Sequence, residues 1–381
     1  MKSIIFALVI SFVVTAVVGK FLIPALQRLK AGQSIKEIGP TWHMTKQGTP
    51  TMGGLMFMVG IGIAIVIMGW KGMLAGDFRH IYVFVFALIF GGIGCIDDMQ
   101  KIRHKQNTGL TAPQKFLLQL AAAIAFICLM RYEGMLSPNL YIPFWHGHLV
   151  LPWWLYLVFA AFVIVGTVNA VNITDGLDGL SSSVTLPVAA FFTAVGVAWQ
   201  GYEQLGLFGG AMLGGLLGFL IYNHFPAKVF MGDTGSMFLG YNLAVLAVMG
   251  FTKSFTLLSL VTPILVLAIP ILDTVFAIIR RKMNNKPIFK PDKNHLHHCL
   301  LNYGFNHRDT VLVIYTVSAV LALCGLIMTY LNPSQGVILL FIISVIIIYG
   351  AMKLGVIGKE NEKEFQQEEA SDIGSNGGQH E

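Results

Sequence analysis

Five aspartates stand where long apolar runs of the sequence begin or end: Asp97, Asp98, Asp175, Asp178 and Asp233. Carboxylates at the edge of a membrane-length apolar run are costly unless a counter-charge compensates them. A divalent cation is the natural compensator, and Mg²⁺ takes oxygen ligands from carboxylates and substrate phosphates. The four cysteines are scattered and show no paired spacing, which argues against zinc. The aspartates therefore predict a magnesium or manganese site.

The surroundings of these aspartates are suited to phosphate. Glycine-rich turns can direct backbone N–H groups at phosphate oxygens, basic side chains can hold a diphosphate, and Phe230 could stack on a base. His295, His297 and His298 add a further polar group. Carboxylates, metal, glycine turns and histidines together predict phosphoryl transfer, in which positioning and charge neutralisation supply most of the rate. The glycines and basic residues concerned are Gly176, Gly179, Gly232, Gly235, Lys46, Lys101, Lys228, Arg281 and Lys282.

Composition indicates that these residues are held by a membrane protein. The chain has 381 residues, of which 55% are hydrophobic and 12% charged, against about 25% charged in soluble domains. Stretches of about 20 apolar residues predict spanning helices, so we expect an all-α integral membrane bundle of about eleven transmembrane helices. They are 3–26, 52–70, 81–96, 114–130, 151–171, 182–199, 205–222, 236–250, 256–279, 310–330 and 336–356.

The distribution of Lys and Arg predicts the orientation of this bundle. With the N-terminus outside, the cytoplasmic loops carry 15 Lys and Arg and the outer loops carry 4, as the positive-inside rule requires. The C-terminus is then cytoplasmic, and the loops that carry the aspartates and histidines all face the cytoplasm. We expect one transmembrane domain over residues 1–358 and an acidic, disordered tail over 359–381. The net charge of +6 is attributed to these loops and an anionic substrate, with no nucleic acid as partner.

Two readings stay open at this point. An ion-coupled transporter also carries intramembrane acids and broken helices, but the acids here lie in loops on one face and no internal repeat is evident. Asp273, inside the ninth stretch and near Pro270, is either a functional acid or a residue at the cytoplasmic helix end. The oligomeric state is not fixed, although lipid-facing apolar surfaces would suit a homodimer.

Four motifs point to a known family. They read KQGTPTMGG at 46–54, Asp97-Asp98, NITDGLDGL at 172–180 and FMGDTG at 230–235. They resemble the polyprenyl-phosphate N-acetylhexosamine-1-phosphate transferases. The first motif, preceded by Gly39-Pro-Thr-Trp-His43, is specifically similar to the phospho-N-acetylmuramoyl-pentapeptide transferases. The resemblance covers residues 20–358 and implies the same eleven-span layout.

The resemblance implies a Mg²⁺-dependent reaction at the cytoplasmic face of the bacterial plasma membrane. Undecaprenyl phosphate would attack UDP-N-acetylmuramoyl-pentapeptide, releasing UMP and forming lipid I. Asp233 would be the main metal ligand with Asp175 as a second, and Asp97 or Asp98 would bind or deprotonate the lipid phosphate. His297 and His298 would be catalytic contacts to the diphosphate or sugar. The residues expected to bind substrate are Lys46, Thr51, Asn172, Asp175, Asp178, Phe230 and His295.

One departure concerns the sugar. The family's run of three histidines is here His295-Leu-His297-His298. This form, with KPDK at 290–293 and Thr234, is more similar to the N-acetylglucosamine-1-phosphate transferases of teichoic-acid and O-antigen synthesis. UDP-N-acetylglucosamine is therefore the alternative donor.

Overall fold

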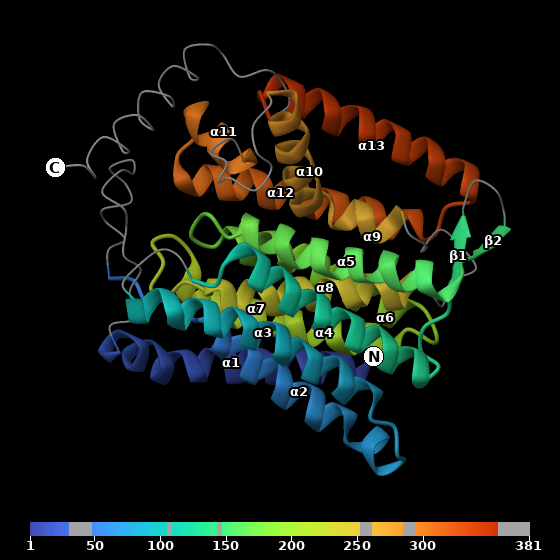
Figure 1. Cartoon of the computed structure of the whole chain (residues 1–381), viewed down its shortest axis with the longest axis horizontal. Helices are drawn as coiled ribbons and strands as arrows, with labels where there is room; N and C mark the ends of the chain where they lie inside the picture. The colour runs from blue at the N-terminus through green and yellow to red at the C-terminus, as the bar shows by residue number, and fades with distance from the viewer. Residues whose placement is uncertain (30–47, 105–108, 143–146, 252–260, 285–294, 357–381) are drawn as a thin grey trace.

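The computed structural model describes residues 1–29, 48–104, 109–142, 147–251, 261–284 and 295–356. Within these ranges the fold is a bundle of long helices with one short hairpin (Figure 1). The elements are α1 (Lys2–Arg28), α2 (Gly54–Leu74), α3 (Arg79–His104), α4 (Ala112–Tyr132), β1 (Asn139–Ile142), β2 (Gly147–Val150), α5 (Trp153–Thr174), α6 (Leu180–Ala198), α7 (Glu203–Asn223), α8 (Gly232–Phe251), α9 (Val261–Val266), α10 (Ala268–Met283), α11 (Leu296–Asn302), α12 (His307–Met328) and α13 (Pro333–Lys353).

Nine of the described helices are long and apolar enough to cross a membrane. Their outer faces expose large apolar side chains, such as Phe21, Phe162 and Phe341, which are 74%, 76% and 69% exposed. Exposed apolar surface on this scale requires a non-aqueous environment. The chain is thus an all-helical, multi-pass membrane protein, as predicted. The count of eleven spans and the sides of the two termini stay predictions.

Small residues allow α1 and α7 to approach closely. A Cβ atom at Gly214 would lie 2.0 Å from the backbone oxygen of Leu8, and one at Gly218 would lie 2.7 Å from that of Phe12. Gly60 of α2 makes a similar approach to Thr15. Small residues four positions apart are the usual means of packing helices in a membrane, where apolar surface alone does not drive association.

The helix α8 occupies the centre of the bundle and packs against α3 and α5. Its Tyr241 is fully buried and stacks on Phe90 of α3, with ring centroids 4.7 Å apart, and meets Phe126 of α4 edge to face at 5.4 Å. Aromatic pairs in these geometries add to the free energy of burial. They fix α3, α4 and α8 relative to one another, and these helices carry the site described below.

The predicted span over 256–279 is wrong as one continuous helix. Residues 252–260 lie outside the described part, and the rest divides at Leu267 into α9 and α10. The cause is local: Pro270 has no N–H to donate to the carbonyl of Val266, and its ring crowds that carbonyl. In Figure 1, α10 consequently stands across the direction of α9 and α12.

A two-stranded antiparallel hairpin, not among the predicted elements, joins α4 to α5. Asn139 pairs with Val150 and Ile142 with Gly147. It falls within the segment 131–150, which the span prediction makes an outer loop. In Figure 1 the hairpin lies at the opposite end of the bundle from α11, so α11 and the hairpin mark the two ends of the molecule.

Candidate active site

The start of α8 is held by a carboxylate of α3. Oδ1 of Asp98 accepts the backbone N–H of Asp233 at 3.2 Å, and Oδ2 accepts the N–H and hydroxyl of Thr234 at 3.0 and 2.7 Å. The first N–H groups of a helix have no partner within the helix, and the helix dipole favours an anion there. Asp98 therefore fixes Asp233 in place at the head of the central helix.

Glycines allow α3 and the start of α8 to approach closely enough for these hydrogen bonds. Gly232 has a φ of +69°, which side-chain-bearing residues rarely adopt. A Cβ there would also lie 2.5 Å from both Oδ2 of Asp98 and Oγ1 of Thr51. On α3, a Cβ at Gly94 would lie 2.1 Å from the backbone oxygen of Asp233. The FMGDTG motif thus needs glycine before Asp233 for steric reasons.

The described part of the first motif, residues 48–54, lies beside the motif at 230–235. The N–H of Phe230 donates to the oxygen of Pro50, and the N–H of Gly53 donates back to the oxygen of Phe230, both at 2.8 Å. Met52, between them, has a φ of +69°. A side chain in this left-handed region is uncommon, and such residues gather at functional sites. The pairing brings Thr51, which is 4% exposed, against Gly232.

Asp233 points into a ring of polar groups. Its Oδ2 lies 2.5 Å from Nζ of Lys115 on α4 and 3.2 Å from Nζ of Lys101 on α3. Lys101 also contacts Oδ2 of Asp97 at 2.6 Å. Oδ1 of Asp97 accepts the N–H of Leu110 at 2.8 Å, which ties the chain before α4 to the end of α3.

The end of α5 contributes an amide to this ring. Nδ2 of Asn172 donates to Oδ1 of Asp233 at 3.0 Å and to Oγ of Ser236 at 2.7 Å. Asn172 is expected to bind substrate, and the structure places it beside the expected metal ligand. Asp175, the expected second ligand, caps the end of α5 and is not part of the carboxylate group around Asp233. The α5 end thus directs Asn172, one turn earlier, at Asp233.

The three carboxylates of Asp97, Asp98 and Asp233, called here the aspartate cluster, can hold a metal ion. One oxygen from each lies within 4.8 Å of the others. Oxygens bound to one Mg²⁺ at about 2.1 Å are about 3.0 Å apart when adjacent and about 4.2 Å apart when opposite, so the three carboxylates would draw closer together around a bound ion. An all-oxygen donor set, with Asp97 and Asp98 buried and Asp233 partly buried, suits Mg²⁺ or Mn²⁺. The residues present therefore fit the predicted metal.

The glycine-rich turn after α5 is hydrogen-bonded to the loop after α7. Asp178 is buried, and its Oδ2 accepts the N–H of Ala227 at 3.1 Å. Asn223, at the end of α7, accepts from Ser182 on α6 at 3.1 Å and donates to the oxygen of Val229 at 2.9 Å. These bonds fix the loop that leads to half-buried Phe230. Asp178, in the turn between α5 and α6, and Phe230, in the loop between α7 and α8, thus belong to two loops that are hydrogen-bonded to each other.

The residues 295–298, called here the histidine segment, lie against that turn. A Cβ at Gly176 would lie 2.6 Å from Nε2 of His297, which is 3% exposed. The rings of His297 and His298 are 4.2 Å apart. Burial, together with the nearby His298, lowers the pKa of His297 to about 3, so this imidazole is neutral at pH 7.

The structure therefore brings together most of the predicted site. Lys46 lies outside the described residues. Lys115 is a site residue absent from the prediction, although a cation in the first turn of an otherwise apolar helix was a usable signal. Its partner, Asp233, is 118 positions away, and the sequence alone does not reveal such pairings.

Comparison with known proteins shows which families the sequence is similar to. Residues 80–251 match the family described as glycosyl transferase family 4. Residues 46–58 match the phospho-N-acetylmuramoyl-pentapeptide-transferase signature 1.

Curated relatives narrow the class. Phospho-N-acetylmuramoyl-pentapeptide-transferase of Clostridium acetobutylicum is 41% identical over 85% of this chain and 98% of its own. The Desulforudis audaxviator protein of the same name is 38% identical over 83% and 95%. A Bacillus subtilis protein, named probable undecaprenyl-phosphate N-acetylglucosaminyl 1-phosphate transferase, is 35% identical over 93% and 94%. The chain belongs to the phospho-N-acetylmuramoyl-pentapeptide-transferase family.

Proposed function

We propose that the chain transfers phospho-N-acetylmuramoyl-pentapeptide from its UDP-linked donor to undecaprenyl phosphate. A phosphate oxygen of the lipid attacks the sugar-linked phosphorus of the donor and forms the new P–O bond. The bond to the UMP oxygen breaks, and UMP leaves with the electron pair. The products are lipid I and UMP. The observation that carries this proposal is the aspartate cluster, set among two lysines and an asparagine at the convergence of four helices.

Each group in the site has a task in this reaction. Asp97 and Asp98 bind the lipid phosphate, and one of them takes its proton when the phosphate is protonated. Lys101 and Lys115 are within reach of the diphosphate, where charge-assisted hydrogen bonds are strong. Bound Mg²⁺, held by Asp233, would neutralise the diphosphate charge. Asn172, Asp175, Asp178 and Phe230 shape the nucleoside pocket, and Thr51 and Lys46 take part in binding the donor.

The location follows from the substrates. Both the Lys/Arg distribution and a lipid acceptor favour a bacterial plasma membrane, with the aspartate cluster on the cytoplasmic side. Asp97 and Asp98 lie about two turns before the end of α3, Asp175 caps the end of α5, and Asp233 lies in the first turn of α8. Water-soluble UDP-sugar and membrane-embedded lipid can meet near these helix ends. The same placement disfavours an ion-coupled transporter, whose acids lie near the middle of the membrane.

UDP-N-acetylglucosamine is the second candidate donor. It is favoured by the spacing of the histidine segment and by the name of the B. subtilis relative. The reaction and the tasks above would be unchanged, because the two donors share the UDP group.

Purified protein, Mg²⁺ and undecaprenyl phosphate, incubated with each UDP-sugar separately, test the proposal. We expect UMP release with the pentapeptide donor and none when lipid or donor is omitted. UMP release with UDP-N-acetylglucosamine but not with the pentapeptide donor would contradict the assigned donor and leave the assigned reaction in place. Absence of UMP with both donors would contradict the reaction.

A further inference from the structure

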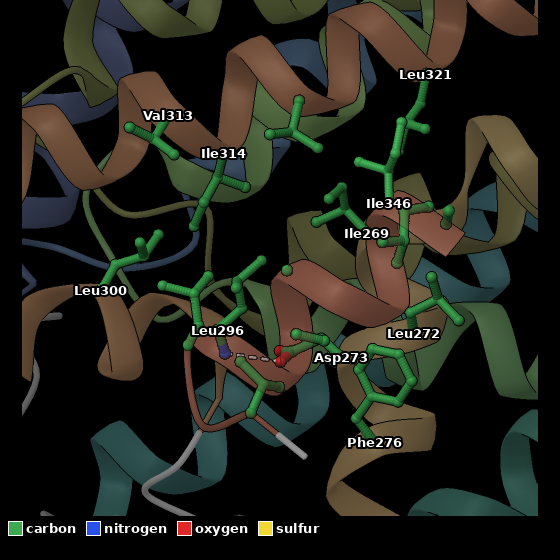
Figure 2. A pocket seen from close by; sticks show the side chains of 17 residues that line it. Ile269, Leu272, Asp273, Phe276, Leu296, Leu300, Val313, Ile314, Leu321 and Ile346 are labelled. Carbon is green, nitrogen blue, oxygen red and sulfur yellow. Dashed lines mark hydrogen bonds between the residues drawn. The ribbon is translucent and has the colours of Figure 1, made fainter. Parts of the chain in front are cut away.

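Asp273 is a buried carboxylate in an apolar part of the molecule. It lies on α10 and is 7% exposed. It lines a cavity of about 250 Å³ between α10, α11, α12 and α13, whose other labelled residues in Figure 2 are aliphatic or aromatic. Burying a carboxylate here is costly unless it is hydrogen-bonded. The partners of Asp273 therefore show what the residue is for.

Both oxygens of Asp273 bind the start of α11. Oδ1 accepts the backbone N–H of Leu296 at 2.8 Å (Figure 2), and Oδ2 lies 3.0 Å from Nδ1 of His295. His295 is the N-cap residue of α11, and its own side chain makes no capping hydrogen bond. Asp273, 23 positions before Leu296, thus supplies the acceptor that a capping side chain usually provides.

The start of α11 determines where the histidine rings lie. The ring of His295 is parallel to that of His297, with an interplanar angle of 3° and centroids 6.0 Å apart. His297 contacts His298 in turn and fills the space over Gly176, in the turn between Asp175 and Asp178. A shift at His295 would therefore move His297 away from this turn.

We propose that Asp273 is the positioning residue of the histidine segment: its carboxylate holds the start of α11 so that His297 stays against Gly176. The proposal rests on the proposed function, in which His297 and His298 contact the diphosphate or sugar. Asp273 touches neither reactant, and it acts through His295 and Leu296.

The main test is the variant Asp273→Leu, which fits the apolar cavity and removes both bonds. We expect kcat to fall about tenfold, the effect of losing a hydrogen bond to a charged group. Asp273→Asn keeps an oxygen for the N–H of Leu296 and offers an N–H to an unprotonated Nδ1 of His295, so it should restore most of the activity. The control is Asp77→Leu, because Asp77, in the loop between α2 and α3, likewise accepts a backbone N–H and side-chain hydrogen bonds, here one backbone and two side-chain bonds from Arg79.

A second readout does not depend on turnover. Diethyl pyrocarbonate modifies accessible neutral imidazoles, and the modified residue is identified by mass spectrometry. In Asp273→Leu, modification of His297 should accelerate about tenfold, while exposed His224 should react as in the wild type. This rate is informative even if the reaction proves different, so the failure of the proposed function and of this inference can be told apart.

Leu296→Pro tests the hydrogen bond between Asp273 and Leu296 by removing its donor. It removes the N–H that Asp273 accepts and leaves the carboxylate in place, and it also replaces the leucine side chain that lines the cavity. Proline is favoured at the first helical position, and the ψ of 157° at His295 suits a residue before proline. If both variants act through one contact, the double variant should be no worse than Asp273→Leu.

Two results would overturn the proposal. One is wild-type kcat in Asp273→Leu with unchanged modification of His297. The other is additive losses in the double variant. If Asp273→Leu does not fold, Asp273→Ala, which also removes both bonds, takes its place in both measurements with the same expected results.

Discussion

The aspartate cluster and the histidine segment are attached to the protein in different ways. The cluster is bonded from several directions: three hydrogen bonds join Asp98 to the head of α8, and Lys101, Lys115 and Asn172 reach Asp233 from α3, α4 and α5. The histidine segment is joined to α10 through the two oxygens of Asp273. The difference suggests that many bonds hold the aspartate cluster before substrate arrives, whereas one carboxylate of α10 holds His295 and Leu296 at the start of the histidine segment.

The comparison predicts the largest effect at Asp233. In Asp233→Asn the side chain keeps its shape and loses its charge, so the cluster loses its main metal ligand. We expect UMP release to fall below detection, by more than ~10³-fold, since metal ions supply several kcal/mol of charge stabilisation. The protein should still insert and elute as a monodisperse peak in detergent. The control is Asp309→Asn, an exposed aspartate at the start of α12. Wild-type turnover in Asp233→Asn would refute the metal assignment.

Asp97→Asn and Asp98→Asn should have the next largest effects. Together they separate the role of a catalytic base from that of capping α8. Each should lower kcat at least ~10²-fold if it serves as the base. Asp98→Asn should also lower the unfolding temperature, because one amide oxygen cannot accept all three bonds from the head of α8. Differential scanning fluorimetry checks the stability and UMP release the rate. Equal unfolding temperatures in the two variants would contradict the capping role of Asp98.

Lys115→Met should lower the rate of UMP release by less than the aspartate variants do. Lys115 makes the shorter contact to Asp233, and losing a charged hydrogen bond costs about 1.5–3 kcal/mol, or about 10- to 150-fold in rate. The rise in KM for the UDP-sugar should exceed any rise for the lipid if Lys115 holds the diphosphate. Unchanged kinetics with both substrates would remove Lys115 from the site.

The smallest predicted effect concerns pH and the histidine segment. The pKa of His297 falls from an ordinary 6.5 to about 3 on folding. The unfolded chain therefore binds more protons below pH 6.5, so the stability from His297 is complete above pH 6.5 and declines as pH falls toward 3. The difference in unfolding temperature between wild type and His297→Gln should narrow by about 2–5 °C from pH 7.5 to pH 5. A constant difference would mean that His297 is not buried as a neutral ring.

Much of the site could be predicted from the sequence because its residues are marked locally. Asp97, Asp98 and Asp233 stand at the ends of apolar runs, and such positions converge at one end of a helical bundle. The all-helical membrane fold follows from the length of those runs in the same way. Family motifs then assigned the chemistry.

What was missed depends on contacts between distant residues. The break at Leu267 could have been suspected from Pro270, but its direction depends on how α10 packs. The partners of Lys115 and Asn172, and the capping of α11 by Asp273, join positions 118, 61 and 23 residues apart. No local pattern encodes these separations. The resemblance implies Asp175 as a second ligand, whereas in the structure Asp175 caps the end of α5 and Asn172 is the α5 residue that contacts Asp233.

Binding of Mn²⁺, a paramagnetic substitute for Mg²⁺, measures most directly whether the aspartate cluster holds a cation. Electron paramagnetic resonance titrations of the wild type with UDP-sugar present should show one Mn²⁺ bound per chain. The bound signal should disappear in Asp233→Asn and persist in Asp309→Asn. Mn²⁺ binding to Asp233→Asn with wild-type stoichiometry and affinity would contradict the account.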